Sequence, residues 1–177
     1  MIKQAGIDFA SLPDEEFDTP FGEASGAGVI FGTTGGVMEA AIRTVYEVLE
    51  KKPLENLNIE PVRGLEGVKK AEVDLNGTKV KLAVVHQMGN VDAVVQEIRK
   101  AAEEGKERPY DFIEVMACRG GCVTGGGQPY GHNDELRVNR ANALYQDDET
   151  HEIRCSHQNP LITKIYDEYF EKPNSEK

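Results

Sequence analysis

The sequence predicts a mixed α/β (α+β) fold, in which a mixed sheet is flanked by helices, and three patterns support this prediction. Two runs of alternating apolar and polar residues, joined by Asn76-Gly77, predict a β-hairpin at about 67–86. Apolar residues at helical spacing between Gly36 and Lys52 predict an amphipathic helix. A third apolar run, at 112–116, ends in glycine-rich sequence and predicts a further strand.

The N-terminal segment, residues 1–24, is acidic, contains prolines and shows no hydrophobic periodicity. We therefore expect it to run as an extended segment over a surface. At the other end, residues 171–177 carry no apolar periodicity and are expected to be a frayed tail. The elements between these ends predict that residues 1–177 form a single domain.

The first helix is expected to begin at the glycines 35–36 and to end at Lys52, just before Pro53. Thr33 or Thr34 could cap its start. Its expected apolar face comprises Val37, Ala40, Ala41, Val45 and Leu49.

The glycines before this helix match neither a GxGxxG pattern nor a Walker motif, so phosphate binding is not expected. Two interpretations are left open for them. They either let Phe31 and Gly32 lie against something large, or they allow simple tight packing.

The hairpin at about 67–86 is expected to be an antiparallel pair with one exposed face, and a helix from about Asn90 to Glu104 follows it. His86 lies at the end of the second strand. It could be a ligand or a proton carrier, but a structural histidine whose nitrogens are both satisfied is the favoured interpretation.

Residues 111–131, DFIEVMACRGGCVTGGGQPYG, contain the chemistry that the sequence indicates. Residues 112–116 predict a short buried strand, and Cys118 and Cys122 follow its carboxyl end, where open α/β sheets bind ligands. A helical turn between the cysteines would put both thiols on one face. The glycines lack Cβ atoms, so their backbone N–H groups could point at a bulky inorganic cofactor.

The spacing alone leaves several roles open for Cys118 and Cys122: cluster ligands, half of a zinc site, or buried small residues. The density of glycines favours a cofactor, because this segment offers few side chains that build a core. The chain contains three cysteines, whereas a thiolate-held four-iron cluster normally takes four. The third, Cys155, has a different sequence context and is expected to be incidental.

Two more helices are expected after the glycines. One covers about 134–150, with Asn133 or Asp134 as its cap and its arginines on a polar face. Pro160 begins the last helix, which reaches Phe170.

The formal net charge of -11 argues against nucleic acid as a partner. No run is long and apolar enough for a membrane span, and the N-terminus lacks the basic and apolar regions of a signal peptide. The expected location is cytoplasmic. A periplasmic location is compatible with the sequence if the chain is exported together with a partner.

Two segments, VMACRGGCVTGGGQP and SGAGVIFGTTGGVMEAAIRTVYE, resemble the C-terminal part of the catalytic domain of iron-only (FeFe) hydrogenases. The segments IEPVRGLEGVKKAEVDLNG and SHQNP are similar to the same family, so the resemblance covers most of the chain. The MACxGGCxxGGGQP motif is highly specific. The resemblance implies the C-terminal lobe of the FeFe-hydrogenase catalytic domain, and reversible reduction of protons to H2 as the reaction.

The resemblance also implies an H-cluster, in which a 4Fe-4S cluster is bridged through one cysteine to a two-iron subcluster. On the matching positions, Cys118 would be a ligand of the four-iron cluster and Cys122 the bridging thiolate. Met116 would pack beside the two-iron unit, and Phe31 with Gly32 would line its other wall.

The chain departs from the family in what it lacks: two upstream cysteine motifs that complete the cluster, and the N-terminal ferredoxin-like domains. The resemblance therefore implies a partial catalytic lobe that is inactive without an upstream lobe, supplied by the same or a separate chain. The abrupt start, without a clear N-cap, favours a fragment. Other expected partners are ferredoxin-like or NAD(P)-linked electron carriers, H2 and protons. A homo-oligomer of this chain is also compatible with the sequence. For the isolated chain, both a metal-bound and a metal-free state are left open.

Two other classes of protein fit part of the sequence. A hydrogenase-like protein of iron–sulfur assembly would share the Cys-x3-Cys pair, but the Met-Ala-Cys and GGGQP segments favour a hydrogenase. A cofactor-free interaction domain would carry inert cysteines, and it predicts no iron after reconstitution with the missing lobe.

Overall fold

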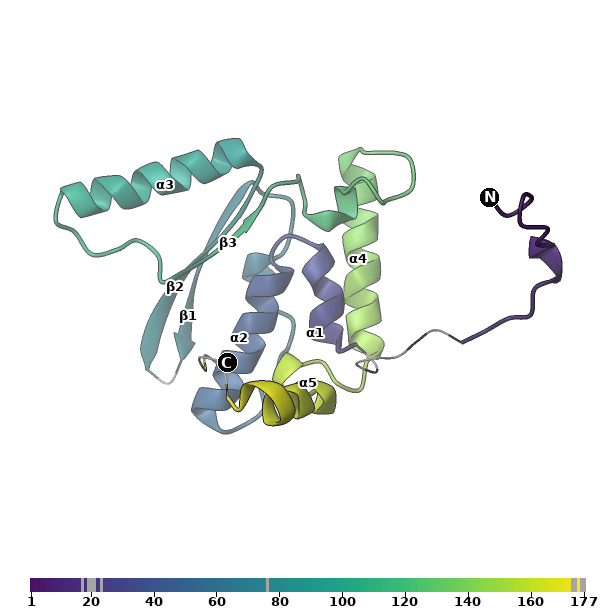
Figure 1. The fold of residues 1–177 in the computed structure, drawn as a ribbon. Coiled ribbons are helices and arrows are strands. Elements are labelled where there is room, and N and C mark those ends of the chain that lie inside the picture. Colours follow the sequence, from purple (N-terminus) through teal and green to yellow (C-terminus); the bar gives the residue numbers. More distant parts are fainter. Residues whose placement is uncertain (17, 19–21, 23, 76, 173–174, 176–177) are drawn as a thin grey trace.

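A three-stranded sheet forms the centre of the computed structural model, which describes residues 1–16, 18, 22, 24–75, 77–172 and 175 (Figure 1). Its strands are β1 (Val68–Leu75), β2 (Thr78–His86) and β3 (Phe112–Met116), in the order β1-β2-β3. β1 and β2 are antiparallel, whereas β2 and β3 are parallel, with His86 opposite Met116. The mixed sheet and the hairpin at about 67–86 are thus confirmed, although Asn76 of the turn lies outside the described residues.

Helices flank this sheet, as the sequence predicted (Figure 1). They are α1 (Gly26–Val29), α2 (Gly36–Glu50), α3 (Met88–Glu103), α4 (Asp134–Thr150) and α5 (Pro160–Ile165). A π-helical turn, Tyr166–Phe170, extends α5, and a 3-10 turn, Ile30–Gly32, leads from α1 toward α2. α2 lies between the sheet and the pair formed by α1 and α4 (Figure 1).

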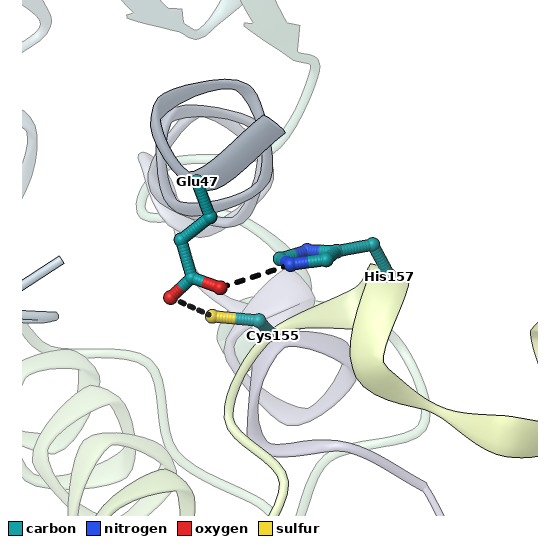
Figure 2. Close-up of side chains that lie close together, drawn as sticks. All are labelled: Glu47, Cys155 and His157. Atoms are coloured by element: carbon teal, nitrogen blue, oxygen red, sulfur yellow. Dashed lines mark hydrogen bonds and ion pairs between the residues drawn. The ribbon is translucent and has the colours of Figure 1, made fainter. Parts of the chain in front are cut away.

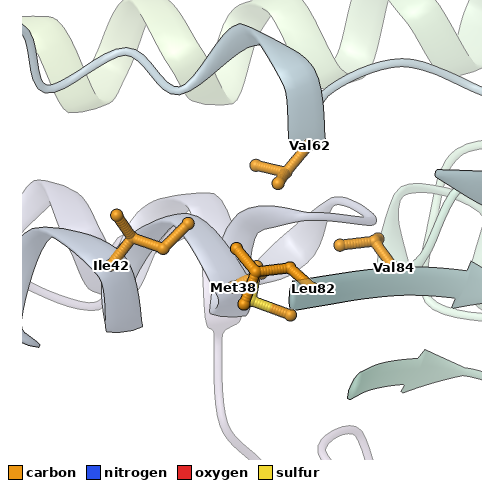
Figure 3. Close-up of a cluster of buried hydrophobic side chains, with 5 residues drawn as sticks. All are labelled: Met38, Ile42, Val62, Leu82 and Val84. Carbon is orange, nitrogen blue, oxygen red and sulfur yellow. The ribbon is translucent and has the colours of Figure 1, made fainter. Parts of the chain in front are cut away.

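The core consists of two clusters on opposite faces of β2. On one face, side chains of α2 pack against the sheet (Figure 3); this cluster comprises Met38, Ile42, Val62, Leu82 and Val84. On the other face, Val94 of α3 and Tyr110 of the segment before β3 pack against Ala83 and Val85 of β2. The expectation of an exposed face is therefore wrong for the second half of β2, because α3 covers it.

β3 is not the buried strand that the apolar run suggested. Phe112 and Val115 are 44% and 50% exposed, while Glu114 is buried. Among the described residues β3 pairs only with β2, so its outer edge has no neighbouring strand. An apolar run on such an edge can stay exposed, and an exposed apolar edge is a surface to which another chain segment can bind.

The buried face of α2 also differs from the predicted face. Val45 and Leu49 are exposed, and the helix instead buries Glu39 and Arg43 completely. Arg43 binds Asp148 of α4 through two contacts of 2.8 Å and Glu39 through one of 2.6 Å. A pairing this complete offsets the desolvation of the charged groups, which explains why charged residues can occupy a core-facing position.

The two ends of the chain were expected to be irregular. Residues 1–16 are exposed and contain a hydrogen-bonded turn at residues 2–6 and a short 3-10 turn, Phe9–Ser11; five of the residues in 17–23 lie outside the described part of the chain. Most of the expected tail at 171–177 lies outside it as well. Among the described helices, none has the length and apolar character needed to cross a membrane.

Candidate functional site

The glycine loop, residues 117–127, leaves the carboxyl end of β3 and carries Cys118 and Cys122. Both cysteines are exposed and free. A helical turn between them, the condition under which i,i+4 spacing puts both thiols on one face, is absent: Gly120 and Gly121 have φ values of 79° and 94°, in the left-handed region. The N–H of Gly121 donates to the carbonyl of Cys118 at 3.1 Å, and the chain then forms a 3-10 turn, Cys122–Thr124. Glycine permits this path because it has no Cβ.

Gly121 makes the closest approach of the loop to the rest of the chain. A Cβ at this position would lie 2.8 Å from Met116 Sδ, 2.8 Å from the backbone N of Thr34 and 3.1 Å from the carbonyl of Gly32. The N–H of Thr34 also donates to the carbonyl of Gly120 at 3.0 Å. The fold therefore brings Met116, Gly32 and the loop that carries both cysteines into one place. Phe31 precedes Gly32 and is 44% exposed.

The sequence suggested that backbone N–H groups of the loop could point at a cofactor, but several of them bond within the chain instead. The Gly120 N–H donates to Nδ1 of His86, and the Gly125 N–H donates to the carbonyl of Cys122. Together with the Gly121 contact described above, these bonds fix the shape of the loop. The donors at these glycines are therefore committed to the fold rather than directed at a cofactor.

His86 is a completely buried residue beneath the glycine loop. Its Nδ1 accepts the Gly120 N–H at 3.3 Å, so Nε2 carries the proton and donates to the Leu65 carbonyl at 3.2 Å. Burial lowers the pKa of His86, although the hydrogen bond to Leu65 opposes this effect. The lowered pKa keeps the ring neutral. This arrangement agrees with the structural interpretation of His86.

Glu114 holds the start of α2 beside the loop. Its two carboxylate oxygens accept the N–H groups of Gly35 at 2.6 Å and Met38 at 2.8 Å. The prediction that Thr33 or Thr34 caps α2 is therefore wrong, since the N-cap is Gly35 and no side chain of the cap residue bonds to the helix. A carboxylate at a helix N-terminus is stabilised by the helix dipole as well as by the N–H groups.

Arg140 of α4 holds the far side of the loop. Its guanidinium donates to the carbonyls of Val123 at 2.9 Å, Pro129 at 2.9 Å and Gly131 at 3.3 Å. The prediction that the arginines of this helix lie on a polar face is wrong for Arg140, because the side chain turns toward the loop. Sequence spacing carries no signal for this role, since the carbonyls it binds come from another segment.

Comparison with known families identifies this arrangement. Residues 1–126 match the family model described as "Iron only hydrogenase large subunit, C-terminal domain", and residues 134–177 match the model of the "Iron hydrogenase small subunit". The chain belongs to the iron-only hydrogenase family. The first match ends at residue 126, within the glycine loop, and the second begins at residue 134. The buried Arg43–Asp148 pair joins the part that matches the large subunit to the part that matches the small subunit.

The relatives of this hydrogenase chain are much longer proteins. It is 46% identical over 178 residues to the NADP-reducing hydrogenase subunit HndD of Solidesulfovibrio fructosivorans, covering 100% of this chain and 29% of that protein. It is 46% identical over 180 residues to iron hydrogenase 1 of Clostridium pasteurianum, covering 98% of this chain and 30% of that protein. The chain thus spans less than a third of these relatives.

Solved hydrogenase structures share the fold. An apo [FeFe]-hydrogenase HydA1 variant from Chlamydomonas reinhardtii superposes with a TM-score of 0.63 at 38% sequence identity, covering 97% of this chain and 48% of that one. The predicted mixed fold of the FeFe-hydrogenase C-terminal lobe is therefore confirmed.

A more distant similarity bears on the assembly alternative. Protein NAR1 of Arabidopsis thaliana is 25% identical over 183 residues, covering 99% of this chain and 37% of that protein. Because the hydrogenases are far more similar over the same span, the hydrogenase interpretation is favoured.

Proposed function

We propose that this chain is the C-terminal half of the catalytic part of an iron-only hydrogenase, which catalyses the reversible reduction of protons to H2. The observation that carries the proposal is the placement of two exposed, free thiols on a loop that packs against Gly32 and Met116. These are the positions at which the family resemblance puts the H-cluster. The donor set fits half of a four-iron site, because thiolates are the usual ligands of such clusters.

In this proposal Cys118 would hold the four-iron cluster, and Cys122 would be the thiolate shared between that cluster and the two-iron subcluster. When bound, the H-cluster supplies the one-electron steps and the formation or cleavage of H2. Met116 is half-buried beside Gly121 and offers an apolar, polarizable surface that excludes water from this wall. Phe31 and Gly32 form the neighbouring wall.

The second half of the site comes from an upstream lobe, in the same chain or in a separate one. Two thiols cannot complete a four-iron cluster, and the chain spans less than a third of HndD and of iron hydrogenase 1. Apolar side chains at the open edge of the sheet, such as Phe112 and Val115, are the surface on which such a lobe would pack. Without the lobe we expect this surface to drive self-association, so the isolated chain could form a homo-oligomer.

The electron partners and the cellular location rest on the same proposal. Ferredoxin-like or NAD(P)-linked carriers would exchange electrons with the complete enzyme. A cytoplasmic location is proposed, and a periplasmic one would require export with a signal-bearing partner.

Hydrogen evolution from reduced viologen tests the proposal. The isolated chain should produce no H2, because an iron cluster with half of its ligands is labile. After reconstitution with the upstream lobe and its cofactor, H2 evolution should appear. In that complex, Met116→Leu should lower turnover while the iron content stays constant, since the substitution conserves volume but removes the thioether.

The outcomes separate the proposal from its alternatives. Hydrogen evolution by the isolated chain would contradict the half-site proposal. An iron–sulfur assembly protein would retain a cluster after reconstitution without evolving H2. A cofactor-free interaction domain would retain no iron at all.

A further inference from the structure

Glu47, Cys155 and His157 bring three different metal-binding atom types together at the end of α2 that is remote from the glycine loop (Figure 2). One ligand atom from each residue lies within 4.8 Å of the other two. Cys155 Sγ is 3.6 Å from Glu47 Oε1, and His157 Nε2 is 3.0 Å from Glu47 Oε2. Glu47 comes from the last turns of α2, whereas Cys155 and His157 flank the start of the 3-10 turn Ser156–Gln158.

The two distances from Glu47 to Cys155 and His157 are close to those of a tetrahedral metal site, and the third pair lies within 4.8 Å. Zinc bonds of about 2.0–2.3 Å place neighbouring ligand atoms of a tetrahedron about 3.3–3.8 Å apart. Small movements of partly exposed side chains would bring the present contacts, 3.0 Å and 3.6 Å, to this spacing. Glu47 and His157 also line a surface cavity of about 380 Å³, from which a water molecule could supply a fourth ligand.

The surroundings of His157 suit a metal ligand. Its second ring nitrogen, Nδ1, lies 3.2 Å from the hydroxyl of Thr44 on α2. In the metal-free chain Nε2 carries the proton and donates to Glu47 Oε2, because a carboxylate only accepts. On metal binding the ring would take its other tautomer, in which Nδ1–H donates to the Thr44 hydroxyl and the lone pair of Nε2 faces the metal. Ligating histidines in metal sites almost always have their other nitrogen fixed in this way.

We propose that Glu47, Cys155 and His157 form a binding site for a divalent transition metal ion of the zinc class, distinct from the iron site of the glycine loop. A carboxylate and a thiolate supply two negative charges against the dication, and a mixed sulfur, nitrogen and oxygen donor set favours Zn²⁺ over Mg²⁺ or Ca²⁺. Gly36 and Glu47 are separated by about 16 Å along α2, at about 1.5 Å per residue. The bound ion would fasten the end of α2 to the segment that follows α4.

The metal-free arrangement has a simpler chemistry, in which Glu47 accepts hydrogen bonds. The Cys155 thiol and the side chain of Gln158 both donate to its carboxylate, the latter at 2.7 Å. Burial and the neighbouring Glu47 raise the pKa of the Cys155 thiol to about 11. Metal binding would therefore replace the thiol proton, which passes to solvent.

The test uses the complete chain with Cys118→Ala and Cys122→Ala, which leaves Cys155 as its single thiol. Both removed thiols are exposed, so their loss should not disturb the fold. Addition of Co²⁺ should produce a thiolate-to-cobalt charge-transfer absorption with a stoichiometry of one, and Zn²⁺ should abolish it by displacement. His157→Ala should weaken the binding at least tenfold, and Thr44→Val should weaken it about tenfold, in the range seen when the partner of a ligand is removed.

A second measurement needs no further variant. Zn²⁺ should protect Cys155 from alkylation in the same double variant, and a chelator should remove the protection. If the charge-transfer absorption is absent, if it persists undiminished in a folded His157→Ala chain, or if Zn²⁺ gives no protection, the three residues are a hydrogen-bonded clamp only and the proposed metal site is wrong.

Discussion

Gly121 is the residue on which the geometry of the glycine loop depends most closely. Its φ of 94° and the short distances from an added Cβ to Met116 Sδ and the Thr34 backbone leave no room for a side chain. Gly126 lies in the same loop, but a Cβ there would meet nothing within 4 Å. The two glycines therefore form a matched pair for substitution.

We predict that Gly121→Ala lowers the free energy of unfolding by about 1–3 kcal/mol, because it adds backbone strain and steric overlap. Gly126→Ala should change it by no more than about 0.5 kcal/mol, as expected of an exposed position. Urea denaturation of both variants measures the difference. Equal stabilities would show that the loop can move away from Met116 at no cost.

His86 gives the loop a dependence on pH. Burial lowers the pKa of His86 in the folded chain below its usual value of about 6.5. As the pH falls below about 6.5, the unfolded chain therefore takes up a proton at this position before the folded chain does, and the free energy of unfolding decreases. Above about 6.5 both states are neutral at His86, and its contribution is constant.

We predict that the loss of stability between pH 7 and pH 5 is smaller in His86→Gln than in the parent chain. Glutamine can still donate to the Leu65 carbonyl but does not titrate. Urea midpoints of both chains at several pH values measure this loss. Subtracting one pH profile from the other cancels the contribution of the carboxylates, which are the same in both chains. Parallel pH profiles would mean that His86 is protonated in the folded chain without cost.

At the scale of elements, Glu114 connects β3 to the first turn of α2. Glu114→Gln leaves one acceptor oxygen for two buried N–H groups, those of Gly35 and Met38. We predict a loss of about 1–3 kcal/mol of stability, the usual cost of a buried donor without a partner. Hydrogen exchange should increase selectively in the first turn of α2.

Glu72→Gln is the control for this prediction. Glu72 lies on β1 with its side chain 47% exposed, and it pairs with Lys79 at 2.8 Å. Exposed pairs of this kind contribute about 0–1 kcal/mol. A comparable loss in both variants would contradict the role assigned to Glu114.

The elements that the sequence predicted correctly are those with strong local signals. The hairpin follows from alternation around a turn sequence, and the start of α4 follows from the Asn133 cap, whose side chain accepts the Leu136 N–H at 2.8 Å. The exposure of β3 could not be predicted, because it depends on which strands are adjacent. The capping of α2 by Glu114 joins residues 76 and 79 positions apart, so no local pattern reveals it.

In the candidate site, too, features with a local sequence signal could be predicted, and features that depend on tertiary contacts could not. Cys118, Cys122 and Met116 are proposed from a specific motif, and the fold brings Gly121 of the loop that carries the cysteines against Met116 and Gly32. The Arg140 contacts and the Glu47–Cys155–His157 cluster depend on tertiary structure. Cys155 and His157 are close in sequence, but Glu47 is 108 residues away from Cys155, so no local pattern reveals the cluster.

At the scale of the whole molecule, the buried pair Arg43–Asp148 holds the two family-matched parts of the chain together. Burial opposes ionisation of Asp148, but hydrogen bonds from Arg43 and Arg154 hold the pKa of its carboxyl below the usual value. Both side chains of the Arg43–Asp148 pair are completely buried. Removal of either partner would therefore leave the other buried charge with only part of its pairing, Arg43 with Glu39 or Asp148 with Arg154.

We predict that Asp148→Asn lowers the free energy of unfolding by about 3–5 kcal/mol, since it leaves buried guanidinium charge without its main partner. The adjacent Asp147 has a side chain that is 59% exposed, so Asp147→Asn should change stability by no more than about 0.5 kcal/mol. Calorimetry or urea denaturation compares the two. A mild effect of Asp148→Asn would mean that water or a rearranged side chain satisfies Arg43.

The hydrogenase account as a whole depends on the two loop thiols as cluster ligands. The most direct measurement is the iron content, cluster spectrum and H2 turnover of the chain reconstituted with its upstream lobe, compared between the parent and Cys122→Ser. We predict that Cys122→Ser loses the two-iron unit and all detectable turnover, because the bridging thiolate is gone. A Cys122→Ser protein with an unaltered cluster spectrum and full turnover would contradict the assignment of the loop and the function proposed from it.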